Sequence, residues 1–283
     1  PAWSREPGCR APRETRPQAT LAASRHRRER SLKERHGRGA SRRLLRSVVR
    51  RTGVAMADAS GSYAVQHLPE WMAKSSFDFA AWRRLWVEQN PRNDRADLAR
   101  LVMFVENARV IEREGVTGCL AELGVYKGTT AKLLHTLFPG RTLWLFDTFE
   151  GFDARDLAHE HRTPNGGFRF DDTSLAAVLR YVGASDRVRA CKGYFPETAA
   201  AVPGDETFAL VHLDADLKKP TEDALAFFYP RMSPGGFIVM HDYGSGAWPG
   251  IAEAVDAFFA DKPESIVRMP DKSGTAIARR VKR

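Results

Sequence analysis

The sequence predicts an α/β protein with a doubly wound, seven-stranded sheet, helices at the N-terminal end and an antiparallel hairpin at the C-terminal end. Two observations lead to this fold class. Five short apolar segments lack the alternation of a half-exposed strand, as expected for parallel strands that helices cover on both faces. Segments with helical spacing separate these strands, which indicates a Rossmann-like succession of strands and helices.

The region from 67 to 114 has the apolar spacing of helices rather than strands. An acid-rich turn around Asp97 opens its second helix, and Gly115 is expected to end it. The apolar residues near one face of that helix are Leu98, Leu101, Val102, Val105 and Val110.

Strands and helices then alternate along the chain. The strands are expected over 117–124, 142–152, 186–195, 208–216 and 235–243. The helices between and after them are expected over 129–138, 173–183, 197–202, 221–232 and 251–261. In the helix over 221–232, Leu225, Phe228 and Met232 recur on one face. The short segments 265–269 and 275–281 flank a turn and predict the final hairpin.

The formal charge of +9 is concentrated at the N-terminal end of the 283-residue chain. Residues 1–55 contain 15 Arg, one Lys and four Glu, a balance of +12, which leaves −3 for the other residues. Because this stretch is Arg-rich and poor in apolar residues, we expect it to be disordered. The acidic balance of the remaining chain argues against a nucleic-acid partner for the folded part.

Three interpretations of the basic stretch stay open. One is a basic arm for RNA, DNA or membrane, and another is an organelle presequence. The third, which we favour, is translated upstream sequence outside the mature protein, because composition changes at Met56, the first methionine. We therefore expect a tail over 1–55, a helical segment over 56–114 that packs on the core and covers the active site, and the main domain over 115–283.

The three cysteines, Cys9, Cys119 and Cys191, form no CxxC pair and no even-numbered disulfide framework. We expect reduced thiols in a cytoplasmic protein. Since no apolar run approaches the roughly 20 residues of a membrane-spanning helix, no membrane partner is expected.

The segment AELGVYKGTT joins the first strand of the sheet to a helix and contains Glu122, Gly124 and Gly128. Glycines at such a turn let a ligand approach the backbone closely. A dinucleotide site has the pattern G-x-G-x-x-G, and the missing third glycine disfavours a nicotinamide-dependent enzyme. An acid with these glycines suits S-adenosylmethionine, which has no phosphate and has a cationic methionine end. Simple helix packing is the alternative.

Asp147 ends the second strand, 25 residues after Glu122. An acid at this position is the usual partner of ribose hydroxyls, whereas a solvated loop aspartate is the alternative. Its combination with the glycine turn favours a cofactor site.

Acids also follow two further strands. Asp214 and Asp216 close the fourth strand, and Asp242 follows His241 at the end of the fifth. Ligands of open α/β sheets bind beyond the carboxyl ends of the strands, so Asp214 and Asp242 are expected to converge there. Carboxylates are ligands of hard cations such as Mg²⁺. We therefore predict a divalent-metal site beside the cofactor turn, with a helix cap or solvated loop as the alternative.

Six segments together resemble the macrocin O-methyltransferase family, whose members methylate sugar hydroxyls in macrolide and aminocoumarin antibiotic pathways. They are AELGVYKG, FDTFEGF, CKGYFPET, HLDADLKKPT, YPRMSPGGFIVMHDYG and WPGIAEAVDAFF. The similarity runs from about residue 95 to about residue 280, in matching order and spacing. It implies a class I methyltransferase fold over 115–283, S-adenosylmethionine, a Mg²⁺ ion and frequent homo-oligomers.

The resemblance also implies roles for individual residues. Asp214 matches the metal-binding aspartate that is also the proposed general base, and Asp242 matches a second aspartate of the metal site. The residues that match the cofactor pocket are Glu122, Gly124 and Asp147, and those expected at the adenine edge, after the third strand, are Lys192, Gly193 and Tyr194.

Two positions depart from the family pattern. His241 stands where the family usually has Asp, and Leu217 is followed by Lys218 where the family reads DLY. Because an imidazole suits softer cations, Mn²⁺, Fe²⁺ and Zn²⁺ join Mg²⁺ as candidates. His241 is also a candidate base, with packing near the strand end as the alternative. His212, inside the fourth strand, is interpreted as a core histidine.

These residues predict an S-adenosylmethionine-dependent, metal-assisted O-methyltransferase that acts on a hydroxyl of a sugar or another small natural-product-like acceptor. The predicted catalytic residues are Asp214 and His241, and the predicted metal ligands are Asp214, His241 and Asp242. The alternative function is a nucleic-acid-associated protein of the same fold that uses the basic tail.

Overall fold

The structure of the protein is a computed structural model, and it describes residues 77–88, 97–160, 169–183 and 185–282 together with Val48 and Thr52. Of residues 1–55, which we expect to be disordered, the structure describes only Val48 and Thr52, and these two are helical. Cys9 and residues 56–76 and 89–96 of the expected helical segment also lie outside the described ranges. Within the described ranges, no helix has both the length and the apolar character to cross a membrane.

Seven strands form one mixed sheet in the order β3-β2-β1-β4-β5-β7-β6. The first five strands of the chain pair in parallel, whereas β7 pairs antiparallel with both β5 and β6. This topology confirms the predicted doubly wound sheet with an antiparallel C-terminal end. The strands are β1 (Cys119–Leu123), β2 (Leu143–Asp147), β3 (Val188–Lys192), β4 (Phe208–Leu213), β5 (Met232–Met240), β6 (Val267–Arg268) and β7 (Ala276–Arg279).

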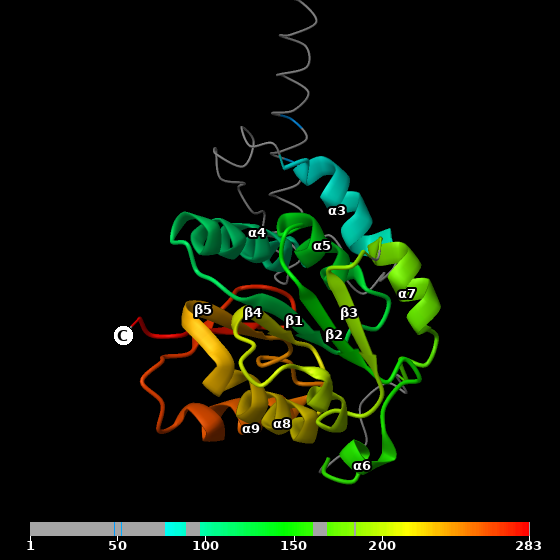
Figure 1. Ribbon diagram of the computed structural model, residues 1–283, viewed down its shortest axis with the longest axis vertical. Helices are drawn as coiled ribbons and strands as arrows, with labels where there is room; N and C mark the ends of the chain where they lie inside the picture. Colours follow the sequence, from blue (N-terminus) through cyan, green and yellow to red (C-terminus); the bar gives the residue numbers. More distant parts are fainter. Residues whose placement is uncertain are drawn as a thin grey trace, which may run out of the picture. The chain divides into compact units, whose positions relative to one another are not determined.

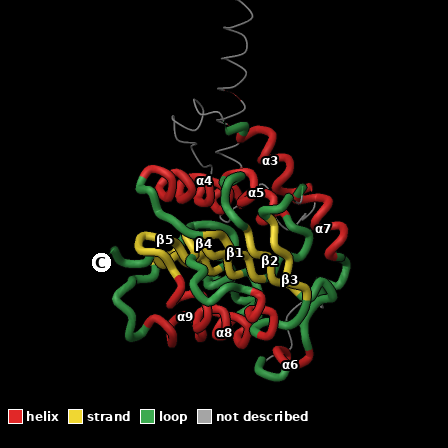
Figure 2. Tube along the Cα trace, viewed as in Figure 1, coloured by secondary structure: helices red, strands yellow, loops and turns green. Residues whose placement is uncertain are grey.

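Helices cover both faces of the sheet, so the fold has three layers (Figures 1 and 2). Helices α3, α4, α5 and α7 lie on one side, and α8 and α9 lie on the other. The helices are α3 (Phe79–Glu88), α4 (Leu98–Arg113), α5 (Thr129–Leu137), α6 (Ala154–Leu157), α7 (Leu175–Val182), α8 (Lys218–Phe228) and α9 (Pro249–Phe259), with short 3₁₀ helices η2 (Glu197–Ala201) and η3 (Tyr229–Arg231).

The buried apolar side chains form one large cluster on each side of the sheet. Along β2, Leu143 and Leu145 belong to the cluster under α3, α4, α5 and α7, whereas Trp144 and Phe146 belong to the cluster under α8 and α9. Successive side chains of a strand point to opposite faces. The uninterrupted apolar run of β2 is therefore required because both faces are covered.

Helix α4 ends where the sequence predicts. Gly115 has a φ of +63°, a left-handed conformation that glycine adopts without steric cost. The backbone N–H of Val116 donates to the carbonyl of Ile111 at 3.0 Å, and that of Gly115 donates to Glu112 at 3.2 Å. These bonds satisfy the last carbonyls of the helix in a Schellman arrangement.

Other element ends differ from the sequence-based expectation. Helix α8 begins at Lys218 rather than at 221, because the carboxylate of Glu160 accepts a hydrogen bond from the Lys218 backbone N–H (2.7 Å). The helix expected over 197–202 is the 3₁₀ helix η2, and the hairpin strand expected over 265–269 is reduced to β6. Helix α6 was not predicted, since it has only four residues.

The order of the strands creates a crevice at the centre of the sheet. From β1 the chain proceeds to β2 and β3 on one side, and from β4 it proceeds to β5 on the other. The connections after β1 and β4 therefore diverge, and ligands of open α/β sheets bind at such a switch point, beyond the carboxyl ends of the strands.

The core on the α8 side should be sensitive to loss of Phe228. This side chain is fully buried, and its ring lies 5.1 Å from that of Phe208 and 4.9 Å from that of Phe227, centroid to centroid. We expect Phe228→Ala to lower the free energy of unfolding by about 3–5 kcal/mol in urea denaturation. Val267→Ala, at a side chain that is 59% exposed, should change it by less than about 0.5 kcal/mol. Equal losses in the two variants would contradict this account of the core.

Candidate active site

A cavity of about 410 Å³ opens at the carboxyl ends of the five parallel strands, β1 to β5. It lies at the switch point between β1 and β4, where the topology predicts a ligand site. The sequence-predicted residues that line it are Glu122, Gly124, Asp147, Gly193, Tyr194, Asp214, His241 and Asp242. The structure therefore brings together residues from the ends of all five parallel strands.

Gly124 fixes the contact between the cofactor turn and β4. A Cβ atom at this position would lie 2.0 Å from the carbonyl oxygen of Asp214, and the backbone φ is +84°. Both conditions exclude any other residue without a shift of the backbone. The ends of β1 and β4 approach one another this closely because the Asp214 N–H donates to the carbonyl of Leu123 at 2.9 Å.

The carboxylate of Asp147 holds two turns of the cavity wall. Its Oδ2 accepts hydrogen bonds from the backbone N–H groups of Val125 (2.7 Å) and Tyr126 (2.8 Å), and its Oδ1 accepts one from Phe149 (2.6 Å). Burial raises the pKa of Asp147, and these three donors counteract part of that rise. The sequence predicts a ribose partner at this position; the structure adds a role in shaping the turn after β1.

Two predicted cofactor residues do not line the cavity. A Cβ atom at Gly128 would lie 3.0 Å from Val178 and 3.2 Å from Val182, so this glycine faces α7. The Lys192 ammonium lies 2.6 Å from the carboxylate of Glu150. The glycine pattern correctly predicts a turn after β1, but Gly128 packs against α7 and does not line the cavity.

Gly193 and Tyr194 do line the cavity, at the end of β3. The Tyr194 hydroxyl donates to Asp156 Oδ1 at 2.9 Å, and Asp156 is itself a buried residue of the cavity wall. Burial raises the pKa of Asp156. The sequence did not point to Asp156, because it lies in the short helix α6 rather than at a strand end.

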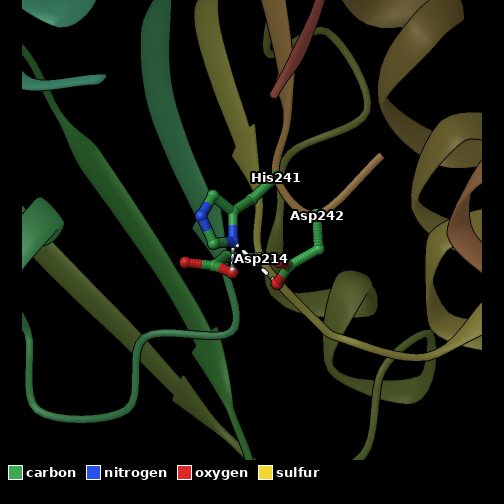
Figure 3. A group of neighbouring side chains, drawn as sticks. All are labelled: Asp214, His241 and Asp242. Carbon is green, nitrogen blue, oxygen red and sulfur yellow. Dashed lines mark ion pairs between the residues drawn. The ribbon is translucent and has the colours of Figure 1, made fainter. Parts of the chain in front are cut away.

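Asp214, His241 and Asp242 converge at the ends of β4 and β5, with their polar atoms facing one another (Figure 3). His241 Nδ1 lies 2.7 Å from Asp214 Oδ1 and 2.9 Å from Asp242 Oδ2. One donor atom of each residue lies within 4.8 Å of the others, as a shared cation requires. Within the described ranges, neither ring nitrogen of His241 has a partner in hydrogen-bond geometry.

The charges of this cluster stabilise one another. Burial and the Arg100 cation act to lower the pKa of His241, but the carboxylates of Asp214 and Asp242 outweigh them and raise it to about 10. Burial alone would raise the pKa of Asp214, yet the neighbouring His241, His212 and Arg100 hold it below its usual range. The cluster therefore favours an ionised Asp214 beside a protonated His241.

Asp216, two residues after Asp214, completes the acidic wall of the cavity. Its φ of +62° turns the chain sharply after β4. Burial, and then the charges of Asp214 and Asp242, raise its pKa well above the usual value. We therefore expect Asp216 to retain its proton more readily than Asp214 does.

His212 is fully buried in β4, as expected of a core histidine, and the edge of its ring packs against Phe104. Its Nδ1 lies 3.0 Å from Oε1 of Glu122, a contact across the sheet that the sequence did not predict. Burial raises the pKa of Glu122 well above its usual value and lowers that of His212 to about 3. The two groups therefore form an uncharged pair beneath the cavity.

Arg100 is a cavity residue that the sequence did not predict. This side chain of α4 lines the cavity together with Asp97, and both are almost completely buried. Asp97 Oδ2 lies 2.7 Å from the Arg100 guanidinium. The sequence feature that could have indicated Arg100 is its spacing from Asp97, three residues earlier on an otherwise apolar helix face. Charged residues are seldom buried unless they are paired.

The sheet order and the cavity at its centre define the fold of class I methyltransferases. The solved structure of the O-methyltransferase NovP shares this fold, with 25% identity and a TM-score of 0.57 over 65% of this chain and 80% of that one. The calicheamicin methyltransferase CalS11 shares it too, with 20% identity and a TM-score of 0.53 over 76% of this chain and 94% of that one.

The chain belongs to the macrocin-O-methyltransferase (TylF) family, whose model matches residues 70–272. It is 33% identical over 150 residues to 8-demethyl-8-(2,3-dimethoxy-alpha-L-rhamnosyl)-tetracenomycin-C 4'-O-methyltransferase of Streptomyces olivaceus, across 47% of this chain and 56% of that protein. It is 32% identical over 161 residues to mycinamicin III 3''-O-methyltransferase of Micromonospora griseorubida, across 52% and 62%. The matched regions thus span little more than half of these relatives.

Gly124 should be the least replaceable glycine of the site. Because its Cβ would overlap the Asp214 carbonyl, we expect Gly124→Ala to cost at least about 2 kcal/mol of stability and to weaken binding of S-adenosylhomocysteine. Urea denaturation and calorimetric titration would measure both effects. The matched control is Gly140→Ala, where nothing lies within 4 Å of the added Cβ. Tight binding in a stable Gly124→Ala protein would show that the strand ends can separate.

Proposed function

We propose that the protein transfers a methyl group from S-adenosylmethionine to a hydroxyl of a sugar or another small natural-product-like acceptor. The observation that carries this proposal is the common cavity of the glycine turn, Asp147 and the cluster Asp214–His241–Asp242. Membership of the family and the printed activities of its relatives support the same reaction. Among those names, a rhamnosyl-bearing compound makes sugar hydroxyls the first acceptors to test.

The residues of β1, β2 and β3 are suited to hold the methyl donor, which supplies an activated methyl group on a sulfonium. Gly124 leaves room for close approach to the backbone, and Glu122 lies beneath that turn. Asp147 fixes the turn, and Gly193 with Tyr194 lines the end of the cavity expected to hold adenine. A rigid donor site raises the rate because it presents the methyl group at attack distance.

The acceptor hydroxyl must lose a proton as it attacks, and Asp214 is placed to accept it. Its side chain is 25% exposed, whereas those of His241 and Asp242 are 11% and 9% exposed. An ionised Asp214 can act as general base, while a protonated His241 cannot. We therefore assign the base to Asp214. His241 stabilises the charge of Asp214 while it is protonated, and it would have to lose its proton to ligate a cation.

The three residues Asp214, His241 and Asp242 fit a divalent cation. They offer two carboxylates and one imidazole, with one ligand atom of each residue within 4.8 Å of the others. This mixed donor set suits Mn²⁺, Fe²⁺ or Zn²⁺ as well as Mg²⁺. A bound cation would supply positive charge that lowers the pKa of the acceptor hydroxyl.

Three expectations from the sequence stay predictions: a homo-oligomer, a cytoplasmic location and a helical segment over 56–114 that covers the active site. The cysteines of the described part, Cys119 and Cys191, are free thiols, which agrees with the absence of a disulfide framework. The nucleic-acid alternative rests on residues 1–55, which the structure describes only at Val48 and Thr52.

Replacement of Asp214 should separate chemistry from donor binding. We expect Asp214→Asn to lower methyl transfer at least about 100-fold because the base is lost. Binding of S-adenosylmethionine should change less than about threefold because the donor lies beyond β1 and β2. The measurements are transfer of labelled methyl to a panel of rhamnosides and calorimetric titration of the donor, with the exposed Asp205→Asn as control. Wild-type turnover in Asp214→Asn would refute this assignment of the base.

Replacement of His241 should change the metal preference. His241→Asp converts the mixed donor set into three carboxylates, so we expect Mg²⁺ affinity relative to Zn²⁺ to rise by about tenfold or more. Calorimetric titration with each cation would measure the ratio, and His159→Asp at an exposed position is the control. An unchanged ratio would mean that His241 does not contact the cation.

A further inference from the structure

A buried arginine stands at the edge of the acidic cluster. The guanidinium of Arg100, which is 3% exposed, lies 3.7 Å from Asp214 Oδ2. Oδ1 of the same carboxylate lies 2.7 Å from His241. Asp214 therefore has Arg100 beside one carboxylate oxygen and His241 beside the other.

Two neighbouring side chains, Asp97 and Trp86, fix the position of Arg100. Asp97 Oδ2 lies 2.7 Å from one guanidinium nitrogen, and the guanidinium carbon lies 5.1 Å from the centre of the Trp86 ring. Asp97 occupies the N-cap of α4, where aspartate usually accepts a backbone N–H, yet its side chain makes no capping hydrogen bond. The Asp97 carboxylate pairs with Arg100 instead, so it holds a cavity side chain in place and does not cap the helix.

We propose that Arg100 is a built-in counter-charge of the metal site: its guanidinium lies beside Oδ2 of Asp214 and limits how tightly the site binds a divalent cation. This inference rests on the proposed metal site. A guanidinium and a metal ion that share one carboxylate repel each other, and burial weakens the screening of that repulsion by salt. Asp97 offsets part of the Arg100 charge, so Asp97 and Arg100 have opposite effects on the cation.

The test is the affinity of the full chain for Mn²⁺, measured by electron paramagnetic resonance. Removal of the positive charge in Arg100→Met should tighten Mn²⁺ binding by about tenfold or more. Asp97→Asn leaves Arg100 without its offset and should weaken Mn²⁺ binding by about threefold or more. Arg100→Lys, which keeps the charge, should stay within about threefold of the wild type. These opposite signs distinguish a counter-charge from a structural support, whose loss would weaken binding in every variant.

Controls separate charge from folding. Arg113→Met removes the same charge from the same helix at a side chain that is 74% exposed, and it should leave Mn²⁺ affinity unchanged. Thermal unfolding and S-adenosylhomocysteine binding report whether each variant is folded. If Arg100→Met does not fold, Arg100→Gln, which also removes the charge, takes its place with the same expected tightening.

Weaker or unchanged binding in folded Arg100→Met, or tighter binding in Asp97→Asn, would overturn the inference. A wild type that binds no Mn²⁺ would overturn both this inference and the metal site. Donor binding and methyl transfer are measured without Mn²⁺ titration, so the methyltransferase proposal can stand or fall separately.

Discussion

The close approach of β1 and β4 is the constraint on which the site depends. Gly124 has no side chain, so its backbone lies directly against the carbonyl of Asp214. Parallel pairing of Leu123 with Leu213 brings the two strand ends level, and both connections leave the sheet from that point. The donor turn and the acidic cluster are thereby held by the sheet itself, which positions reacting groups more reproducibly than flexible loops can.

The cavity contains more ionisable groups than a protein interior normally tolerates. Burial of a charge costs free energy unless a partner compensates it. Here each charged side chain lies next to one of opposite sign. The successive neighbours are Asp97, Arg100, Asp214, His241 and Asp242. Helix α4 therefore does more than cover the core, because its Arg100 supplies one of the positive charges in this series of ion pairs.

Local sequence patterns predicted the strands, their covered faces and the residues at the strand ends, because each of these depends on a short stretch of chain. Asp214 and Asp242 could be placed side by side once β4 and β5 were recognised as sequential parallel strands. Arg100 could not be placed, because its proximity to Asp214 depends on the rotation and packing of α4. For the same reason the sequence could not show that Gly128 faces α7, because that depends on how α5 packs against α7.

The two edge strands of the sheet determine whether copies of this chain can associate by pairing their strands. Within the described residues, one edge is β6, which offers only two residues of unpaired backbone. The opposite edge, β3, carries the exposed charged residues Arg189 and Lys192. Short or charged edges resist the addition of another strand. Sheet extension is thus disfavoured at both ends, and an oligomer of this protein is expected to form through helices or loops.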